Sequence, residues 1–438
     1  MKKLCGFIAM ALCVVACNKI NEKNVQPEGM PFSATIRIDD GAVTKALSED
    51  GTTLVASWAA GEKVGLVHGV VDEMTVTPNG DGTATISGTI TNSPADGAPV
   101  TIVYPASAAQ AYGSGIKPDL LKVQNGLLTG EGSISKKYDV RKGSGTFKVD
   151  GETVTLSETV SLTNQNAIIK FSIGSKTIDS NLPFYILNGN NEIITTVIPS
   201  SPGAVSTFYV AMAPVTEGSF KFVWGESDGY KYYQTKTATI AAGKYYQSPL
   251  TGWTVRSPQL ISFVEAGDIG SVIGSDRKIY FNSYAATHQG TTPLAMIAYV
   301  GNASDCTKGL AIALEDVSSS EYTWADAPGA VTNWATGKAI DGGAWRIPTL
   351  VDWQNMFIGC GAGGPVNPSP SYDSDMSYSG LASMLEMAQG TALQWDHYWS
   401  GSSYSEDNAW RLKFDGSKAS FYYDGKTNTD YVRACLAF

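Results

Sequence analysis

The residues that most often carry out chemistry are sparse in this chain. It has 438 residues but three histidines: His68, His288 and His397. None of them lies in the motif of a nucleophile elbow or of a His-Glu-x-x-His zinc helix. His397 follows Asp396, and a carboxylate in that place can orient an imidazole, but no recognisable nucleophile lies nearby. The sequence therefore predicts that the protein is not an enzyme.

The six cysteines fall into two groups of three. One group lies within the first seventeen residues, and the other consists of Cys306, Cys360 and Cys435. The spacing of the second group does not match a zinc site. In an oxidising compartment two of these three could form a disulfide, and buried thiols explain them equally well.

Two acidic clusters fall in stretches whose composition is typical of loops. The candidate ligand or calcium residues are Asp373, Asp375, Tyr404, Glu406, Asp407 and Asn408. Carboxylate and amide oxygens suit calcium, and binding sites concentrate on loops that a rigid scaffold holds. Exposed tyrosines among Tyr372, Tyr378 and Tyr404 would offer ring faces to a sugar. Solvated surface loops explain the same residues without a ligand or cofactor, so the sequence leaves both interpretations open.

The segments around these loops have the spacing of two short helices followed by strands. Thr349 is a candidate helix cap, and Asp352 lies three residues further on, as in a capping box. Apolar residues of 353–360 then share one helical face, and those of 381–388 repeat the spacing. From Trp399 onward apolar and polar residues alternate, which is typical of half-buried strands. We therefore expect residues 256–438 to form an α+β domain, which we call the head.

Upstream of the head, from residue 32 to about residue 250, strand and turn patterns dominate. Four pairs of strand-like runs flank turn sequences rich in Asn, Asp and Gly: 74–77 with 83–90, 146–149 with 152–156, 184–187 with 192–197, and 220–224 with 230–233. Such pairs predict β-hairpins. Because many short strands lie close together, we expect β-sandwiches rather than βαβ units. The length suggests two sandwiches, residues 31–145 and 146–255.

The N-terminus indicates an exported, lipid-anchored protein. Lys2 and Lys3 precede an apolar run over residues 4–16, which is too short to span a bilayer. The run ends in Val14-Val15-Ala16 directly before Cys17, and this order resembles a bacterial lipobox. We expect residues 1–16 to be a signal peptide, Cys17 to carry the lipid, and residues 17–30 to be a flexible tether.

Charge narrows the range of partners. The formal net charge is −10, and the head carries 19 acidic and 11 basic residues. This balance argues against a nucleic-acid partner, because phosphate contacts need clustered Lys and Arg.

Four segments ahead of the head resemble the fimbrillin family of Bacteroides-type lipoproteins. They are Thr44-Lys45-Ala46-Leu47, Trp58-Ala59-Ala60-Gly61-Glu62-Lys63-Val64, Val103-Tyr104-Pro105 and Gly243-Lys244-Tyr245-Tyr246. The resemblance implies two tandem transthyretin-like β-sandwiches on a surface lipoprotein. It also implies a proteolytic cut near the first strand, for which Lys45 is the candidate, and strand exchange with other pilus subunits. A simple loop lysine is the competing interpretation of Lys45.

The head has motifs of its own. Trp345-Arg346-Ile347-Pro348, Tyr398-Trp399-Ser400 and Val432-Arg433-Ala434-Cys435 resemble bacterial C-type-lectin-like modules. Because such folds often tie a helix to the last strand, the resemblance implies a disulfide between Cys360 and Cys435. The calcium-sugar signatures of animal lectins are absent from the sequence.

The sequence thus predicts a mostly β protein of three domains at the outer membrane or cell surface. We expect a fimbrillin-type adhesin, a minor or tip pilus subunit whose lectin-like head binds a host or microbial glycan or protein. The alternative is an outer-membrane lipoprotein that stands alone and captures glycans or proteins. A third interpretation is an enzyme with a degenerate motif.

Overall fold

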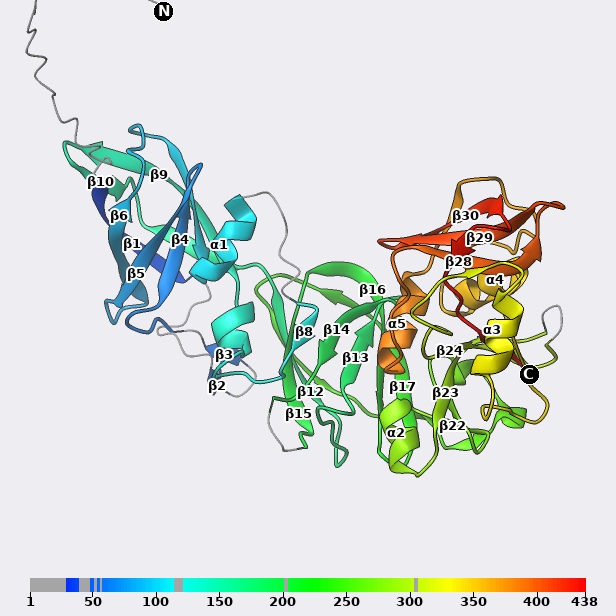
Figure 1. Ribbon diagram of the computed structural model, residues 1–438. Coiled ribbons are helices and arrows are strands. Elements are labelled where there is room, and N and C mark those ends of the chain that lie inside the picture. The colour runs from blue at the N-terminus through cyan, green and yellow to red at the C-terminus, as the bar shows by residue number, and fades with distance from the viewer. Residues whose placement is uncertain are drawn as a thin grey trace, which may run out of the picture.

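The computed structural model describes residues 29–38, 48–50, 53–55, 57–113, 121–200, 204–302 and 306–438. Strands make up most of its regular structure, as the sequence predicts. They form three successive groups along the molecule, which we call the first unit, the second unit and the head (Figure 1). Among the described residues, no helix has the length and apolar character needed to cross a membrane.

The first unit is one eight-stranded sheet. Its strands are β1 (Met30–Ile38), β4 (Lys63–Val67), β5 (Val71–Pro78), β6 (Thr83–Ile90), β7 (Pro99–Tyr104), β9 (Arg141–Asp150), β10 (Thr153–Leu156) and β11 (Val160–Asn164). On one edge β1 pairs antiparallel with β6 from Met30 to Arg37, and on the other it pairs parallel with β10 and β11. The sheet therefore closes on itself through β1, where we expected two separate layers.

Alternation along β1 explains why it sits inside this closed sheet. Phe32, Ala34, Ile36 and Ile38 are buried in the first unit's core. The intervening side chains are exposed or half-buried. A strand with one apolar face suits a curved sheet with a filled interior.

The four predicted hairpins are confirmed. They are β5 with β6, β9 with β10, β13 (Phe184–Leu187) with β14 (Ile193–Val197), and β16 (Val215–Gly225) with β17 (Lys231–Ile240). The boundary we expected between residues 145 and 146 falls within β9, which belongs to the first sheet together with β10 and β11. The first sheet therefore continues to Asn164. The sequence did not show this, because hairpin signals mark turns but do not say which sheet a strand joins.

The second unit consists of two sheets around a shared core. One holds β12 (Ala167–Ser172), β15 (Thr207–Met212) and β18 (Tyr245–Pro249), and the other holds β8 (Val123–Gln124), β13, β14, β16, β17 and β19 (Thr254–Arg256). Phenylalanines from both sheets meet between them. The ring centroids of Phe184 and Phe208 lie 4.9 Å apart, and those of Phe171 and Phe222 lie 5.4 Å apart.

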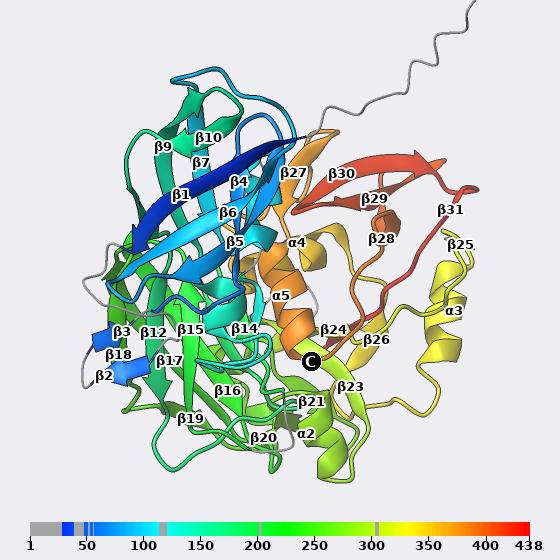
Figure 2. The ribbon, with the colours of Figure 1, turned by 90° about the vertical axis from the view of Figure 1, so that its left-hand side faces the viewer.

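The chain passes back and forth between the first and second units. After β1 it forms the hairpin of β2 (Ser48–Asp50) and β3 (Thr53–Val55), which lies beside β12 and β18 (Figure 2). After β7 come α1 (Ala106–Gly113), then β8, which pairs with β14 of the second unit, and then η1 (Ile134–Tyr138). Two separate excursions therefore join the two units.

The head is built from two main sheets, and helix α4 contacts both of them. The seven-stranded sheet contains β20 (Gln259–Leu260), β21 (Val272–Gly274), β22 (Lys278–Tyr280), β23 (Pro293–Val300), β24 (Gly309–Ala313), β26 (Ala344–Arg346) and β32 (Cys435–Ala437). The four-stranded sheet contains β27 (Ser374–Ser377), β28 (His397–Ser403), β29 (Asn408–Asp415) and β30 (Lys418–Gly425). The remaining elements are η2 (Ile261–Phe263), η3 (Ala266–Asp268), α2 (Ser283–His288), β25 (Tyr322–Thr323), α3 (Ala327–Trp334), α4 (Leu350–Gly359), α5 (Ser379–Met387) and β31 (Thr429–Asp430).

Both predicted helices of the head are confirmed. At the start of α4, Thr349 accepts from the backbone N–H of Asp352, whose carboxylate accepts from the N–H of Thr349 in return. The predicted apolar faces of α4 and α5 are buried in one core cluster, which includes Trp353 and Met384. Because α4 contacts both sheets, it sets the position of the four-stranded sheet and its loops.

The second unit and the head share one hydrophobic core, although their sheets are separate. Tyr185 and Val223 face away from the second unit's own core and pack in the cluster of the head. The ring centroid of Tyr185 lies 6.4 Å from that of Phe281. A Cβ added at Gly225 would lie 2.1 Å from the ring of Phe281, so this close approach requires glycine. The expected boundary at residues 255 and 256 falls within β19.

A buried lysine also crosses this junction. Lys231 of β17 donates to the carbonyl of Ile269 at 2.6 Å and to the hydroxyl of Ser271 at 3.3 Å. Burial lowers the pKa of Lys231 to about 7. The hydrogen bonds satisfy an ammonium group that would otherwise be costly to bury.

Candidate binding face of the head

Five aromatic side chains gather at one end of the four-stranded sheet. We call this surface the tyrosine platform; it consists of Tyr372, Tyr404, Trp410, Tyr422 and Tyr423. Trp410 of β29 lies opposite Tyr423 of β30 in the strand register. Tyr422 is also on β30, and because it is next to Tyr423 its side chain points to the opposite face of the sheet. The remaining two tyrosines come from loops, since Tyr372 precedes β27 and Tyr404 follows β28.

Tyr404 is the centre of the platform. Its ring stacks on that of Tyr423 with centroids 3.8 Å apart and planes 3° apart, and its edge contacts Trp410 at 5.3 Å. Tyr404 nevertheless remains 49% exposed, whereas Trp410 beneath it is buried. A hydrogen bond with Tyr404 raises the pKa of the Tyr423 hydroxyl.

Tyr372, from the loop before β27, extends the platform beyond β30. It is 57% exposed, and its ring meets Tyr422 and Tyr423 edge-on, with centroids 5.1 and 5.0 Å away. These edge-to-face contacts are a preferred aromatic geometry, so they hold the exposed ring in place. Sequence reasoning named Tyr372 and Tyr404 but missed Tyr422 and Tyr423, which the strand pattern had assigned to structure alone.

Tyr378 does not belong to this surface, contrary to our expectation. It is 5% exposed, and its ring packs against Phe414 with centroids 4.9 Å apart. Tyr378 immediately precedes α5 and is therefore turned into the core of the head rather than into the loop.

The first acidic cluster already has partners within the protein. Asp373 accepts a hydrogen bond from the hydroxyl of Tyr422, and this bond raises the pKa of that hydroxyl. Asp375 forms an ion pair with Lys418 at 2.7 Å. Asp373 therefore positions Tyr422 of the platform, and Asp375 joins β27 to Lys418 of β30.

The second cluster, Glu406-Asp407-Asn408, lies in the turn between β28 and β29, beside Tyr404. Lys426 donates to the backbone carbonyls of Ser405 and Glu406, each at 2.8 Å. The side-chain amide of Asn408 donates to the hydroxyl of Ser405 at 3.2 Å. These bonds hold the turn that carries Tyr404.

The two clusters do not combine into a metal site. Within the described ranges, no three His, Cys, Asp or Glu side chains gather where they could hold an ion.

A partly buried ion network lies on the face of the sheet that carries Arg411, and sequence reasoning missed it. Arg411 of β29 pairs with Asp424 at 2.8 Å and with Asp430 at 3.2 Å. Burial raises the pKa of Asp430 to about 7 although Arg411 opposes the shift. His397 lies nearby, with its ring 6.1 Å from that of Tyr422, and its Nδ1 is 3.1 Å from the carboxylate of Asp396. The only sign of this network in the sequence is the alternation of apolar and polar residues along β29, which turns Arg411 away from the core.

The expected disulfide between Cys360 and Cys435 is not formed. The thiol of Cys360 donates to the carbonyl of Ala298 on β23, 3.5 Å away. Burial raises the pKa of both thiols, that of Cys360 to about 12. Cys306 is buried as well.

Two predicted modification sites, the lipid-bearing Cys17 and the candidate cleavage site Lys45, lie outside the described residues.

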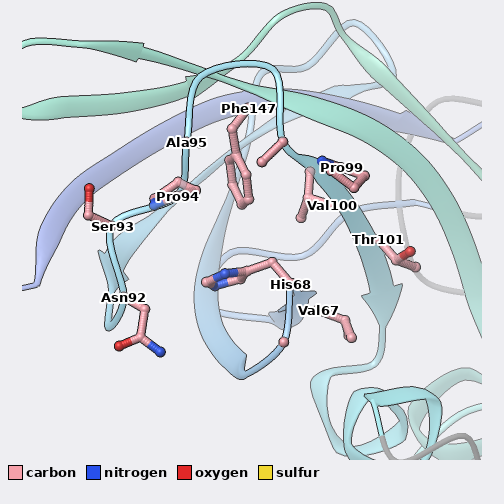
Figure 3. Close-up of a pocket in the computed structure, with 12 residues that line it drawn as sticks. Val67, His68, Asn92, Ser93, Pro94, Ala95, Pro99, Val100, Thr101 and Phe147 are labelled. Atoms are coloured by element: carbon pink, nitrogen blue, oxygen red, sulfur yellow. The ribbon is translucent and has the colours of Figure 1, made fainter.

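A cavity of about 500 Å³ opens at one end of the first unit (Figure 3). Its lining includes His68, Pro94, Val100 and Phe147. The Nε2 of His68 lies 2.8 Å from the carboxylate of Asp72, and its ring meets that of Phe147 edge-on at 5.3 Å. Burial opposes ionisation of Asp72, but hydrogen bonds from Thr91 and His68 outweigh it and lower its pKa.

No family model and no curated protein matches this chain. Among solved structures, it is similar to a fimbrial protein from Bacteroides ovatus, with 14% identity, coverage of 94% of this chain and 99% of that one, and a TM-score of 0.26. It is also similar to a fimbrial assembly protein from Parabacteroides distasonis, with 11% identity, 52% and 96% coverage, and a TM-score of 0.26. A tip fimbrial protein from Porphyromonas gingivalis gives 11% identity, 52% and 99% coverage, and a TM-score of 0.26. TM-scores this low carry no inference about function.

Proposed function

We propose that this protein is a cell-surface adhesin whose head presents the tyrosine platform to a ligand. One observation carries the proposal: Tyr372 and Tyr404 are large, about half exposed, and held in fixed positions by other rings. Ordered, exposed aromatic rings offer contact area without a large loss of conformational entropy on binding. The first and second units then act as the support between this face and the cell.

The lipid anchor belongs to the same proposal. Residues 1–16 would be removed, and Cys17 would hold the mature chain in the outer membrane. The tether of residues 17–30 would lead into β1, the first strand of the first unit. In Figure 1 that unit and the head lie at opposite ends of the molecule.

The pilus form of this function requires a cut after Lys45 and the release of β1. The pairing of β1 on both edges favours the alternative, a lipoprotein that stands alone. Eight residue pairs join β1 to β6, and further pairs join it to β10 and β11. Removing β1 would open the closed sheet and expose the core that Phe32 and Ile36 cover.

Cells that display the full chain test the adhesin proposal. We expect them to adhere to glycan-bearing or matrix-coated surfaces, and cells that display a Tyr372→Ala, Tyr404→Ala double variant to adhere less at equal surface amounts. A lack of adhesion to every surface, with the protein folded and displayed, would reject the function.

The mature N-terminus separates the two forms. A pilus subunit is expected to begin at Ala46 in material sheared from the cell surface, whereas a lone lipoprotein begins at the lipidated Cys17.

A further inference from the structure

The platform is rigid before any ligand arrives. Tyr404 stacks on Tyr423 and contacts Trp410 with its edge, and the turn that carries it is closed by the two hydrogen bonds from Lys426. Tyr372 is held by two further rings. A ligand that docks here pays little for ordering the side chains it touches.

Ring faces and hydroxyl groups together restrict the chemistry of the ligand. The face of an aromatic ring carries partial negative charge and attracts the partial positive charge of C–H groups. One face of a pyranose ring presents several C–H groups in a plane, while its hydroxyl groups project from the edge. The tyrosine hydroxyls and the exposed turn at residues 404–408 provide hydrogen-bonding groups for such an edge.

The charges around the platform restrict it further. Four carboxylates lie around the platform: Asp375 is on β27, and Asp373, Glu406 and Asp407 are on the two loops. Two cations are close, but Lys418 pairs with Asp375 and Lys426 is bound to backbone carbonyls. The rim is therefore net negative. It repels sialylated or sulfated chains, whereas a neutral saccharide meets no such repulsion.

We propose that the tyrosine platform binds neutral saccharides by stacking, without calcium. This inference rests on the adhesive function proposed above and names the ligand class of that face. Calcium has no role in it, because Asp373 and Asp375 already serve Tyr422 and Lys418. Recognition by ring faces needs no metal.

The test is a glycan array probed with residues 18–438, which keeps the core shared by the second unit and the head intact. We expect binding to neutral glycans, weaker binding to sulfated or sialylated forms of the same chains, and no effect of a chelator. Tyr404→Ala is expected to weaken binding by about fivefold or more, because stacking on a protein aromatic ring, as measured for nucleic-acid bases, contributes a loss of that size.

Two variants serve as matched controls. Tyr404→Phe keeps the ring and is expected to stay within about threefold of the parent affinity. Phe263→Ala removes another exposed aromatic side chain, 66% exposed on η2, and is expected to leave binding unchanged. Equal thermal unfolding temperatures would show that the variants are folded.

Three results would overturn the inference: selective binding to anionic glycans, loss of binding with chelator, or unchanged binding by Tyr404→Ala. Adhesion assays on periodate-treated surfaces separate the two proposals. If displayed protein adheres equally well after periodate, the ligand is not a saccharide while the adhesive function survives. If nothing adheres to any surface, the function itself fails.

Discussion

The carboxylate of Glu49 and the ammonium group of Lys170 lie 2.6 Å apart and form an ion pair between β2 and β12. Glu49 also accepts a hydrogen bond from the hydroxyl of Tyr245 on β18. β2 lies between strands of the first unit in sequence, whereas β12 and β18 belong to the second unit. Glu49 thus holds the first excursion of the chain against the second unit.

Replacing Glu49 by alanine is expected to destabilise this junction. The change removes the acceptor of both Lys170 and Tyr245, which are only partly exposed, and should cost about 1 kcal/mol. Thermal unfolding measures the effect. Glu73→Ala is the control, because Glu73 pairs with Lys63 at 3.3 Å on a more exposed surface and should change stability very little. Equal losses in the two variants would contradict a special role for Glu49.

The same junction should weaken in acid. Hydrogen bonds from Lys170 and then Tyr245 lower the pKa of Glu49 below its ordinary value of 4.5. A lowered carboxyl pKa contributes stability that is fully present above 4.5 and is lost as the pH falls through the folded-state value. The difference in unfolding free energy between the parent and Glu49→Gln should therefore shrink below about pH 4.5. Urea titrations at neutral pH and down to pH 3 provide the measurement; a constant difference would reject the assignment.

The second unit and the head are expected to unfold together. Tyr185 is buried between them, and Tyr185→Ala should cost about 3 kcal/mol through the cavity it leaves. Hydrogen exchange should then rise in β13 and β16 as well as in β23 and α4. Ile86→Ala, in the core of the first unit, should raise exchange in that unit instead. Independent unfolding of the head would show that the shared core does not couple the two.

Thiol labelling checks the absence of the disulfide. Because Cys306, Cys360 and Cys435 are buried and the thiolate is the reactive form, native protein of residues 18–438 should take up no alkylating reagent. Denaturation without reductant should allow all three to react. Uptake at one cysteine alone would indicate that the other two are paired.

Local features of the fold were readable in the sequence. The capping box of Thr349 and Asp352 and the four hairpin turns depend on residues close together in the chain, so their patterns predict the structure directly. The alternation of 410–414 likewise predicts which side chains of β29 enter the core.

Long-range features were not readable. Nothing in the residues of β1 says that both its edges will be paired, and two residues of β8 are too few to show that they join the second unit. The stacking of Tyr404 on Tyr423 depends on the register of two strands and a turn. Tyr378 was misplaced for a related reason, since its burial is decided by the direction of α5 and not by the composition of its loop.

The placement of β1 has a mechanical consequence. A pull on the chain ahead of Met30 acts along the axis of this strand, while its hydrogen bonds to β6 and to β11 run across that axis. The bonds on both edges must then slip together instead of opening one after another. An adherent cell under flow would load the first unit in this shearing direction, in which the hydrogen bonds on both edges of β1 share the force.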